Sequence, residues 1–307
     1  MPKLFGGSEF IDNLLNKIWM NLYQGLWDGI NEIWSWMQGV RTFFFTNSQE
    51  LISKTPSGWN ETAFTFVKNI ADNAVIPIAG CIITFVFCLQ IISMVQESNQ
   101  MHNIKPETML LLMIKLIICM ILCAKSFDIV CGLFDIGAKA AEQVTSSDLT
   151  SAGYGSLESI LPRDNPDGYS FGSCMAMLIY LMITFLALII EAVIGVLVYI
   201  KVNMWFMELL VYASAAPIPF ATFMNKEWGQ TGTNYTRKML AMSFQGFFML
   251  IVFGMYNALC SSVLALDTSG IGNTYLMSMV IACGCGAGLI VMLNHIGSIS
   301  SSIFNAH

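Results

Sequence analysis

The pattern of apolar positions is dominated by one long run between residues 174 and 224. Its two parts, 174–200 and 202–224, each exceed the roughly 20 apolar residues that carry a helix across about 30 Å of hydrocarbon. A water-soluble core does not require about 50 nearly uncharged residues in a row, so the run predicts a membrane protein. Three charged residues interrupt it: Glu191, Lys201 and Glu208.

Further apolar stretches predict additional membrane helices. We expect these spans near residues 74–96, 109–131, 239–266 and 274–293. Lys115 is the one charge inside the first 16 residues of the second of them. Beyond it, Asp128 and Asp135 are seven residues apart and share a helix face, which predicts an amphipathic extension of that helix to residue 145.

The first 55 residues show a different pattern. Apolar residues recur every three or four positions from Ile11 to Phe44, which predicts one amphipathic helix. Tryptophan is enriched at the membrane–water interface, and four candidates for interface anchors lie here: Trp19, Trp27, Trp34 and Trp36. We therefore expect an arm that lies on the membrane surface or packs on neighbouring subunits.

These patterns divide the chain into four parts, and the predicted fold class is all-α. The protein should be a polytopic transmembrane helical protein with five or six spans and an N-terminal amphipathic helix. The parts are the arm (1–55), a first membrane half (56–145), a central polar loop (146–172) and a second membrane half (173–307).

Two observations disagree on the number of spans. Counting Lys and Arg in the loops favours six spans with a cytoplasmic amino terminus. However, no Gly or Pro between Tyr199 and Trp205 makes a hairpin at Lys201, and Pro217 with Pro219 forms a stronger break. The alternative is five full crossings, with 202–224 re-entrant or interfacial and with the amino terminus and central loop outside.

Composition supports the membrane class and excludes several functions. The chain is 55% hydrophobic and 11% charged, against a usual charged fraction of about 25%. Its net charge of −6 argues against direct binding of nucleic acid by the chain, because such binding would need a basic stripe. The nine cysteines fall mostly inside apolar runs and the three histidines are scattered. We therefore expect packing thiols, no disulfide framework, no metal site and no cofactor.

No catalytic pattern survives inspection, since GxSxG, HExxH, P-loop and dinucleotide motifs are absent, and we do not expect an enzyme. Ionisable residues in a membrane are costly, so each is a functional candidate; the alternative is helix packing or snorkelling to the interface. The candidates for polar contacts at helix interfaces or in a lumen are Glu191, Lys201, Glu208, Lys115, Asp128 and Asp135. Helix packing is predicted at Gly284, Gly288, Pro217 and Pro219.

Several stretches carry a resemblance to a known family. They are 55–60 (TPSGWN), 73–92 (NAVIPIAGCIITFVFCLQII), 126–130 (SFDIV), 208–220 (ELLVYASAAPIPF) and 228–237. In these the chain resembles the TrbL/VirB-six class of polytopic inner-membrane subunits of type IV secretion, in the short version of Gram-positive conjugative elements. The resemblance covers most of residues 55–295, and it rests on hydrophobic patterns with a few Trp, Pro and Asp positions.

The resemblance implies a structural role. Members have an outside amino terminus and a cytoplasmic carboxy terminus, and they assemble as a ring, a pentamer where seen. We therefore expect a non-enzymatic channel or scaffold subunit in the cell membrane that helps relaxase-linked single-stranded DNA cross it. The implied partners are other copies of the chain, other channel subunits, cytoplasmic ATPases, membrane lipid and the passing DNA. The alternative is a secondary transporter that uses Glu191 and Glu208 as an ion or proton site.

Overall fold

The computed structural model describes residues 6–97, 106–145, 156–165, 168–225, 228–264 and 274–306. These residues form helices and connecting segments with no strand among them, so the all-α prediction is confirmed. The helices are α1 (Gly6–Ile52), α2 (Pro56–Trp59), α3 (Glu61–Ile70), α4 (Ile76–Glu97), α5 (Pro106–Ala124), α6 (Ser126–Thr145), α7 (Phe171–Ala215), α8 (Pro217–Ala221), α9 (Gly229–Leu264) and α10 (Thr274–Ile303). A π-helical turn, Ala71–Val75, joins α3 to α4.

Within these ranges, five helical segments are long and apolar enough to cross a membrane. Each exceeds the roughly 17 residues that the shortest crossing requires. The protein is therefore a multi-pass membrane protein, as the apolar pattern predicts. The segments are Glu61–Gln96, Pro106–Ala124, Phe171–Met224, Gly229–Cys260 and Tyr275–Ile303.

Helix α7 continues through Lys201 without a break and ends at Ala215. No Gly or Pro near Lys201 interrupts it, whereas Pro217 lacks the backbone N–H that would continue the ladder. Its 45 residues extend for roughly 68 Å, more than one crossing requires. The continuous helix supports the alternative of five crossings over the alternative of six.

The second predicted span is shorter in the structure than in the sequence pattern. Helix α5 ends at Ala124 and α6 begins at Ser126, whereas the pattern predicts one helix to residue 131 with an extension. The Ser126 hydroxyl donates a hydrogen bond of 2.8 Å to the carbonyl of Cys123. Such a bond to the preceding turn competes with the helical ladder and favours a bend.

The chain forms two compact units, each built from three stretches. Unit 1 comprises Met1–Ser48, Asp148–Tyr199 and Val252–Met292, and unit 2 comprises Gln49–Ser147, Ile200–Ile251 and Leu293–His307.

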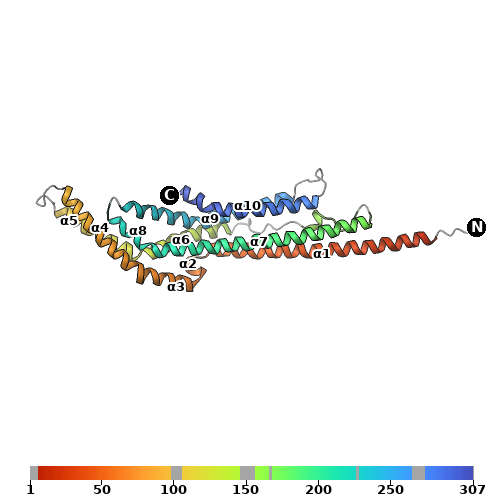
Figure 1. Cartoon of the computed structure of the whole chain (residues 1–307), viewed down its shortest axis with the longest axis horizontal. Helices are drawn as coiled ribbons and strands as arrows, with labels where there is room; N and C mark the ends of the chain where they lie inside the picture. Colours follow the sequence, from red (N-terminus) through yellow and green to blue (C-terminus); the bar gives the residue numbers. More distant parts are fainter. Residues whose placement is uncertain are drawn as a thin grey trace, which may run out of the picture. The chain divides into compact units, whose positions relative to one another are not determined.

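In unit 1, α1 lies along the first part of α7 (Figure 1). Trp19 of α1 packs edge-on against Phe171 at 5.8 Å between ring centroids. Further along, a Cβ on Gly195 would lie 2.7 Å from a ring carbon of Phe44, so glycine is needed for this close approach. The buried face of α1 consists of Tyr23, Trp27, Ile30, Trp34, Met37 and Phe45. Along this face the predicted arm packs on its own chain.

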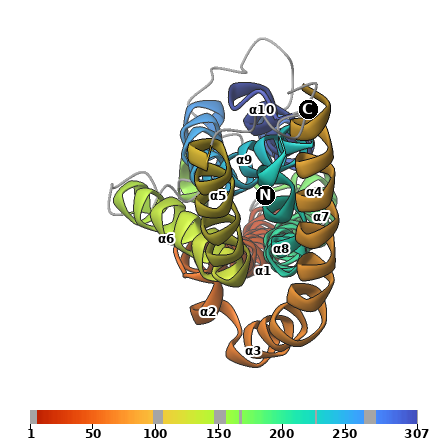
Figure 2. The same ribbon diagram turned by 90° about the vertical axis from the view of Figure 1, so that its left-hand side faces the viewer.

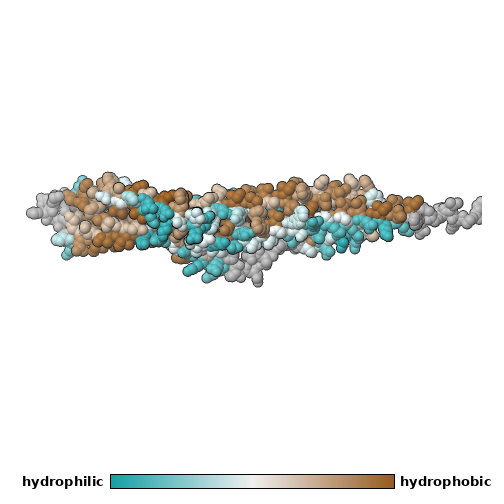
Figure 3. All heavy atoms as spheres, turned by 90° about the horizontal axis from the view of Figure 1, so that it is seen from below, coloured by the Kyte–Doolittle hydropathy of each residue, from teal (hydrophilic) through white to brown (hydrophobic). Residues whose placement is uncertain are grey.

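In unit 2, α8 packs against both α4 and α5 and lies between them (Figure 2). The outer surfaces of α4 and α5 are mostly apolar in the face drawn at the left of Figure 3. Phe85, Leu110 and Ile121 are each more than half exposed. A lipid environment accommodates such a surface, whereas water does not.

Candidate functional site

A buried cation lies inside unit 1. Arg41 of α1 is 4% exposed, and its Nη2 donates a hydrogen bond of 2.9 Å to Oδ1 of Asn257 on α9. Its guanidinium carbon lies 4.9 Å from the ring centroid of Tyr256 and 5.6 Å from that of Phe45. Both distances are within the range of a cation–π contact, so Arg41 binds α9 through charge as well as through a hydrogen bond.

Glu191 supplies a buried carboxyl group in the same neighbourhood. It lies on α7 and is 2% exposed. Glu191 and Arg41 both lie within electrostatic reach of Tyr256 and Cys260 on α9. The three helices α1, α7 and α9 therefore meet at one polar network. Opposite charges that are buried together are tolerated because each offsets the desolvation of the other. Such a network can stabilise the contact between helices.

The sequence pattern missed Arg41 because the arm is expected to turn its charges toward water. One signal was available. Met37, Arg41 and Phe45 are spaced by four residues, so Arg41 falls in register with the apolar face of α1. A charge in the apolar register of a helix indicates a buried partner.

The structure separates the two acids of the long apolar run. Glu208 is exposed on the unit 2 part of α7, and Lys201 is half-buried. Glu191 and Glu208 are 17 residues apart on one continuous helix, which is about 25 Å. This separation argues against one ion site that uses both carboxylates.

In unit 2 the segment after α7 enters the space between α4 and α5 and turns back toward α9. We call residues 217–225 the re-entrant segment. Its carbonyls are paired by side chains: Cys123 Sγ donates to Pro217 O at 3.4 Å, and Cys119 Sγ to Phe220 O at 3.4 Å. Thr222 Oγ1 donates to Pro219 O at 2.7 Å. Backbone that leaves the helical ladder at membrane depth requires such partners.

In this segment Pro217 is buried and Pro219 half-buried, and their packing role stays a prediction. Cys119 and Cys123 are expected from sequence only as small packing residues. Their i, i+4 spacing on α5 places both thiols on the face that meets the re-entrant segment. The structure therefore adds a hydrogen-bonding role to these two thiols.

The acids of α6 lie at the surface of unit 2. Asp128 is paired with Lys68 at 3.1 Å and with Lys125 at 3.6 Å. All three side chains are substantially exposed, so these pairs add little stability. Asp135 and Asp128 flank Cys131, whose thiol pKa is raised to about 12, first by burial and then by the two carboxylates. At neutral pH this thiol is protonated and therefore a poor nucleophile.

The predicted packing glycines of α10 are not packed within the chain. Gly284 and Gly288 are exposed, and a Cβ on either would meet nothing within 4 Å. Gly286 is the residue in close contact, since a Cβ there would lie 2.5 Å from Cδ1 of Ile194. Gly288 lines an apolar groove of about 220 Å³ with residues of α9 such as Met255 and Leu259.

The four predicted interface tryptophans divide into two groups. Trp27 and Trp34 are buried in unit 1, Trp19 is half-buried and Trp36 is exposed. Trp27 Nε1 donates a hydrogen bond of 3.0 Å to the carbonyl of Leu161. Nearby, Arg163 pairs with Asp28 at 3.2 Å. Trp27 thus connects part of the central loop to α1 through a hydrogen bond. For the exposed Trp36, anchoring at the membrane–water interface stays a prediction.

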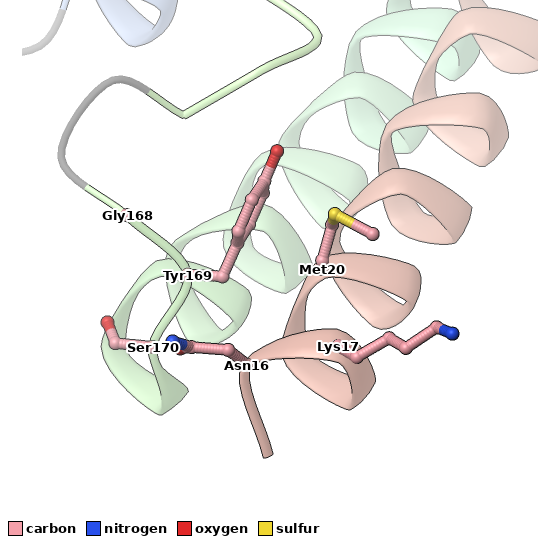
Figure 4. Close-up of a pocket in the computed structure, with 6 residues that line it drawn as sticks. All are labelled: Asn16, Lys17, Met20, Gly168, Tyr169 and Ser170. Carbon is pink, nitrogen blue, oxygen red and sulfur yellow. The ribbon is translucent and has the colours of Figure 1, made fainter. Parts of the chain in front are cut away.

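A pocket of about 510 Å³ lies at the start of α7 in unit 1, lined by Asn16, Lys17, Met20, Gly168, Tyr169 and Ser170 (Figure 4). The Lys17 side chain extends away from Tyr169 and Ser170 (Figure 4). Ser170 and Ser173 cap the helix reciprocally, Ser170 N to Ser173 Oγ at 2.8 Å and Ser173 N to Ser170 Oγ at 3.3 Å. The polar groups do not converge on one point, so the pocket is not assigned a ligand.

Among the described residues, no three His, Cys, Asp or Glu side chains are grouped so that they could hold a metal ion.

Comparison with known proteins gives one match. The family model described as TrbL/VirB6 plasmid conjugal transfer like protein matches residues 45–217, which is more than half of the chain. A search of curated proteins and a search of solved structures found no match. The matched range contains both candidate regions in part, including α4, α5, Glu191 and Pro217.

Proposed function

Because the chain belongs to the TrbL/VirB6 plasmid conjugal transfer-like family, we propose that it is a non-enzymatic channel subunit of a conjugative type IV secretion system. In this role it helps relaxase-linked single-stranded DNA cross the cell membrane. The observation that carries the proposal is the family match over residues 45–217, in a chain with five membrane-compatible helical segments.

The polar architecture supports a structural role. The buried guanidinium of Arg41 donates a hydrogen bond from α1 to α9, and Glu191 of α7 is buried as well. An enzyme needs a nucleophile, base or metal held in reach of a substrate pocket, and the Cys131 thiol of α6 is held protonated. These features fit a scaffold whose charges hold helices together.

The proposed partners follow from the family. Copies of the chain form a ring, a pentamer by resemblance, and other secretion subunits and cytoplasmic ATPases join it. The net charge of −6 implies that this chain supplies little of the DNA affinity. In this proposal the ATPases provide the energy for transport, and the chain forms part of the channel.

Deletion of the gene in a donor cell tests this function. We expect conjugative transfer to be lost while the relaxase still nicks its DNA, because the chain acts after DNA processing. Transfer is counted as recipients that acquire the element, and nicking is measured at the origin of transfer. Expression of the intact chain from a second locus must restore transfer. Normal transfer by the deletion strain would refute the proposal.

A further inference from the structure

The re-entrant segment contacts the last two turns of α5. Cys123 near the end of α5 contacts Pro217, and Cys119 one turn earlier contacts Phe220. After the turn, the Trp228 ring packs edge-on against Phe85 of α4, 6.2 Å between centroids. Phe85 is nine residues from the start of α4 at Ile76, which is about 13 Å along the helix.

Lys115 lies at this depth on α5. It is nine residues from Pro106 and nine from Ala124, so about 13 Å of helix separates it from either end. Residues four apart occupy the same helix face, so Lys115 shares the face of Cys119. It therefore lies one turn beyond the contact with Phe220, where the re-entrant segment turns back.

The environment of Lys115 does not suit lipid. The side chain is exposed, and within the described residues it makes no hydrogen bond or ion pair. A lysine near the end of a span snorkels to the interface, but both ends of α5 are too distant here. Charged residues at the centre of a membrane face a protein interior or a water-filled cavity.

The irregular backbone that follows the contacts with Cys123 and Cys119 points to the same environment. Helical order ends at Met224, and Asn225 has an extended conformation. Such backbone occurs at membrane depth only where protein buries it or where it lines a water-filled cavity. Two features of unit 2, a central lysine and irregular backbone, therefore call for water or protein around them instead of lipid.

Resting on the proposed function, we propose that Lys115 lines a water-filled path at mid-membrane depth and binds phosphodiester groups of the transported strand. A lysine ammonium is a compact charge that pairs with phosphate without a fixed geometry. One such contact for each copy of the chain is weak enough to release a moving polyanion, as conduction requires. The neutral residues around it, Leu111 and Ile118, add no further affinity.

Cysteine labelling tests the water-filled path. Cys81 and Cys88, which are exposed, are first replaced by Ala to lower the background. Lys115→Cys is then compared with Ile117→Cys, which lies two residues away at the same depth on the opposite side of α5 and is also exposed. Donor cells with the assembled secretion system are treated with a small, charged, membrane-impermeant methanethiosulfonate.

We expect labelling of Lys115→Cys and none of Ile117→Cys, because only the first faces water. Absence of labelling at Lys115→Cys would overturn the proposal. Equal labelling at both positions would overturn it as well, because α5 would then not lie between lipid and a water-filled path.

Charge substitution tests the phosphate contact. Lys115→Arg should transfer DNA normally. Lys115→Gln should lower transfer about tenfold, since loss of one phosphate contact weakens binding of a polyanion by about tenfold. Lys115→Glu should lower transfer further. Lys125→Gln, at the exposed residue that follows α5, is the control and should transfer normally. The amount of each variant in the membrane is measured in parallel.

Normal transfer by Lys115→Glu would overturn the phosphate contact. If the deletion strain lacks transfer while Lys115→Glu retains it, only this inference fails. If the deletion strain itself transfers normally, the proposed function fails, and the labelling result still reports whether Lys115 faces water.

Discussion

The two units of the protein differ in which polar groups lie in their interior. In unit 1 charged side chains lie inside the helix packing, with Arg41 and Glu191 each less than 5% exposed. In unit 2 the interior holds irregular backbone instead, and the charges of Lys115, Asp128 and Glu208 lie on its surface. In a low-dielectric interior, a buried charged side chain or a backbone group outside the helical ladder is tolerated only when it has a bonding partner. The two units therefore differ in position of charge, because Arg41 and Glu191 are buried whereas Lys115, Asp128 and Glu208 lie at the surface of the chain.

The largest effect should come from the charge network of unit 1. Arg41→Met removes the guanidinium that bonds Asn257 and lies in the same network as the buried Glu191, and a buried charge left uncompensated costs about 3–5 kcal/mol. We expect this loss in the free energy of unfolding, measured in mixed micelles by tryptophan fluorescence. The double variant Arg41→Met/Glu191→Gln should be more stable than the single variant, because both charges are then gone.

The control for this network is Lys17→Met, on an exposed position of the same helix, which should change stability by less than about 0.5 kcal/mol. If the losses of Arg41→Met and Glu191→Gln simply add in the double variant, the two groups are not coupled. The joint between α1, α7 and α9 would then rest on Asn257 and the aromatic rings alone.

An intermediate effect should come from the contact between α6 and α9 in unit 2. A Cβ on Gly137 would collide with the backbone carbonyl of Ser243, which has no rotamer by which to move away. Gly137→Ala should therefore cost about 1–3 kcal/mol, measured by the same unfolding assay. Gly132→Ala on the same helix meets nothing within 4 Å and should be neutral or stabilising, because alanine favours the helix.

The matching position in unit 1 sharpens the contrast. A Cβ on Gly286 meets only the terminal methyl of Ile194, and a side chain can rotate where a backbone cannot. Gly286→Ala should thus cost less than Gly137→Ala. The reverse order would contradict the view that unit 2 is organised around close backbone contacts.

The smallest effect should come from the thiols that pair the re-entrant backbone. Cys119→Val removes the donor to Phe220 O at nearly constant volume and should cost about 0.6–1 kcal/mol, the range of such bonds in membrane proteins. Cys119→Ser keeps a donor and should lose less. Cys88→Val, at an exposed position of α4, is the control. Equal stability of Cys119→Val and Cys119→Ser would show that the thiol only fills space.

Sequence reasoning located the intramembrane charges but could not rank them. Glu191 and Glu208 look alike in sequence, since each is a single acid inside an apolar run. The structure separates them, because it buries Glu191 and exposes Glu208. Burial depends on which face of α7 meets α1 and α9, and an almost uniformly apolar helix carries no amphipathic pattern that identifies this face.

What the sequence determined by itself is the class of the protein. The length of an apolar run sets whether a helix can cross hydrocarbon, and this holds whatever its neighbours are. The all-α fold, the membrane spans and the family resemblance could therefore be stated in advance. Only the tertiary structure decided that Arg41 is buried and that thiols pair the re-entrant backbone. These features depend on contacts between residues far apart in the chain, such as Arg41 with Asn257 and Cys119 with Phe220, and local patterns do not encode such contacts.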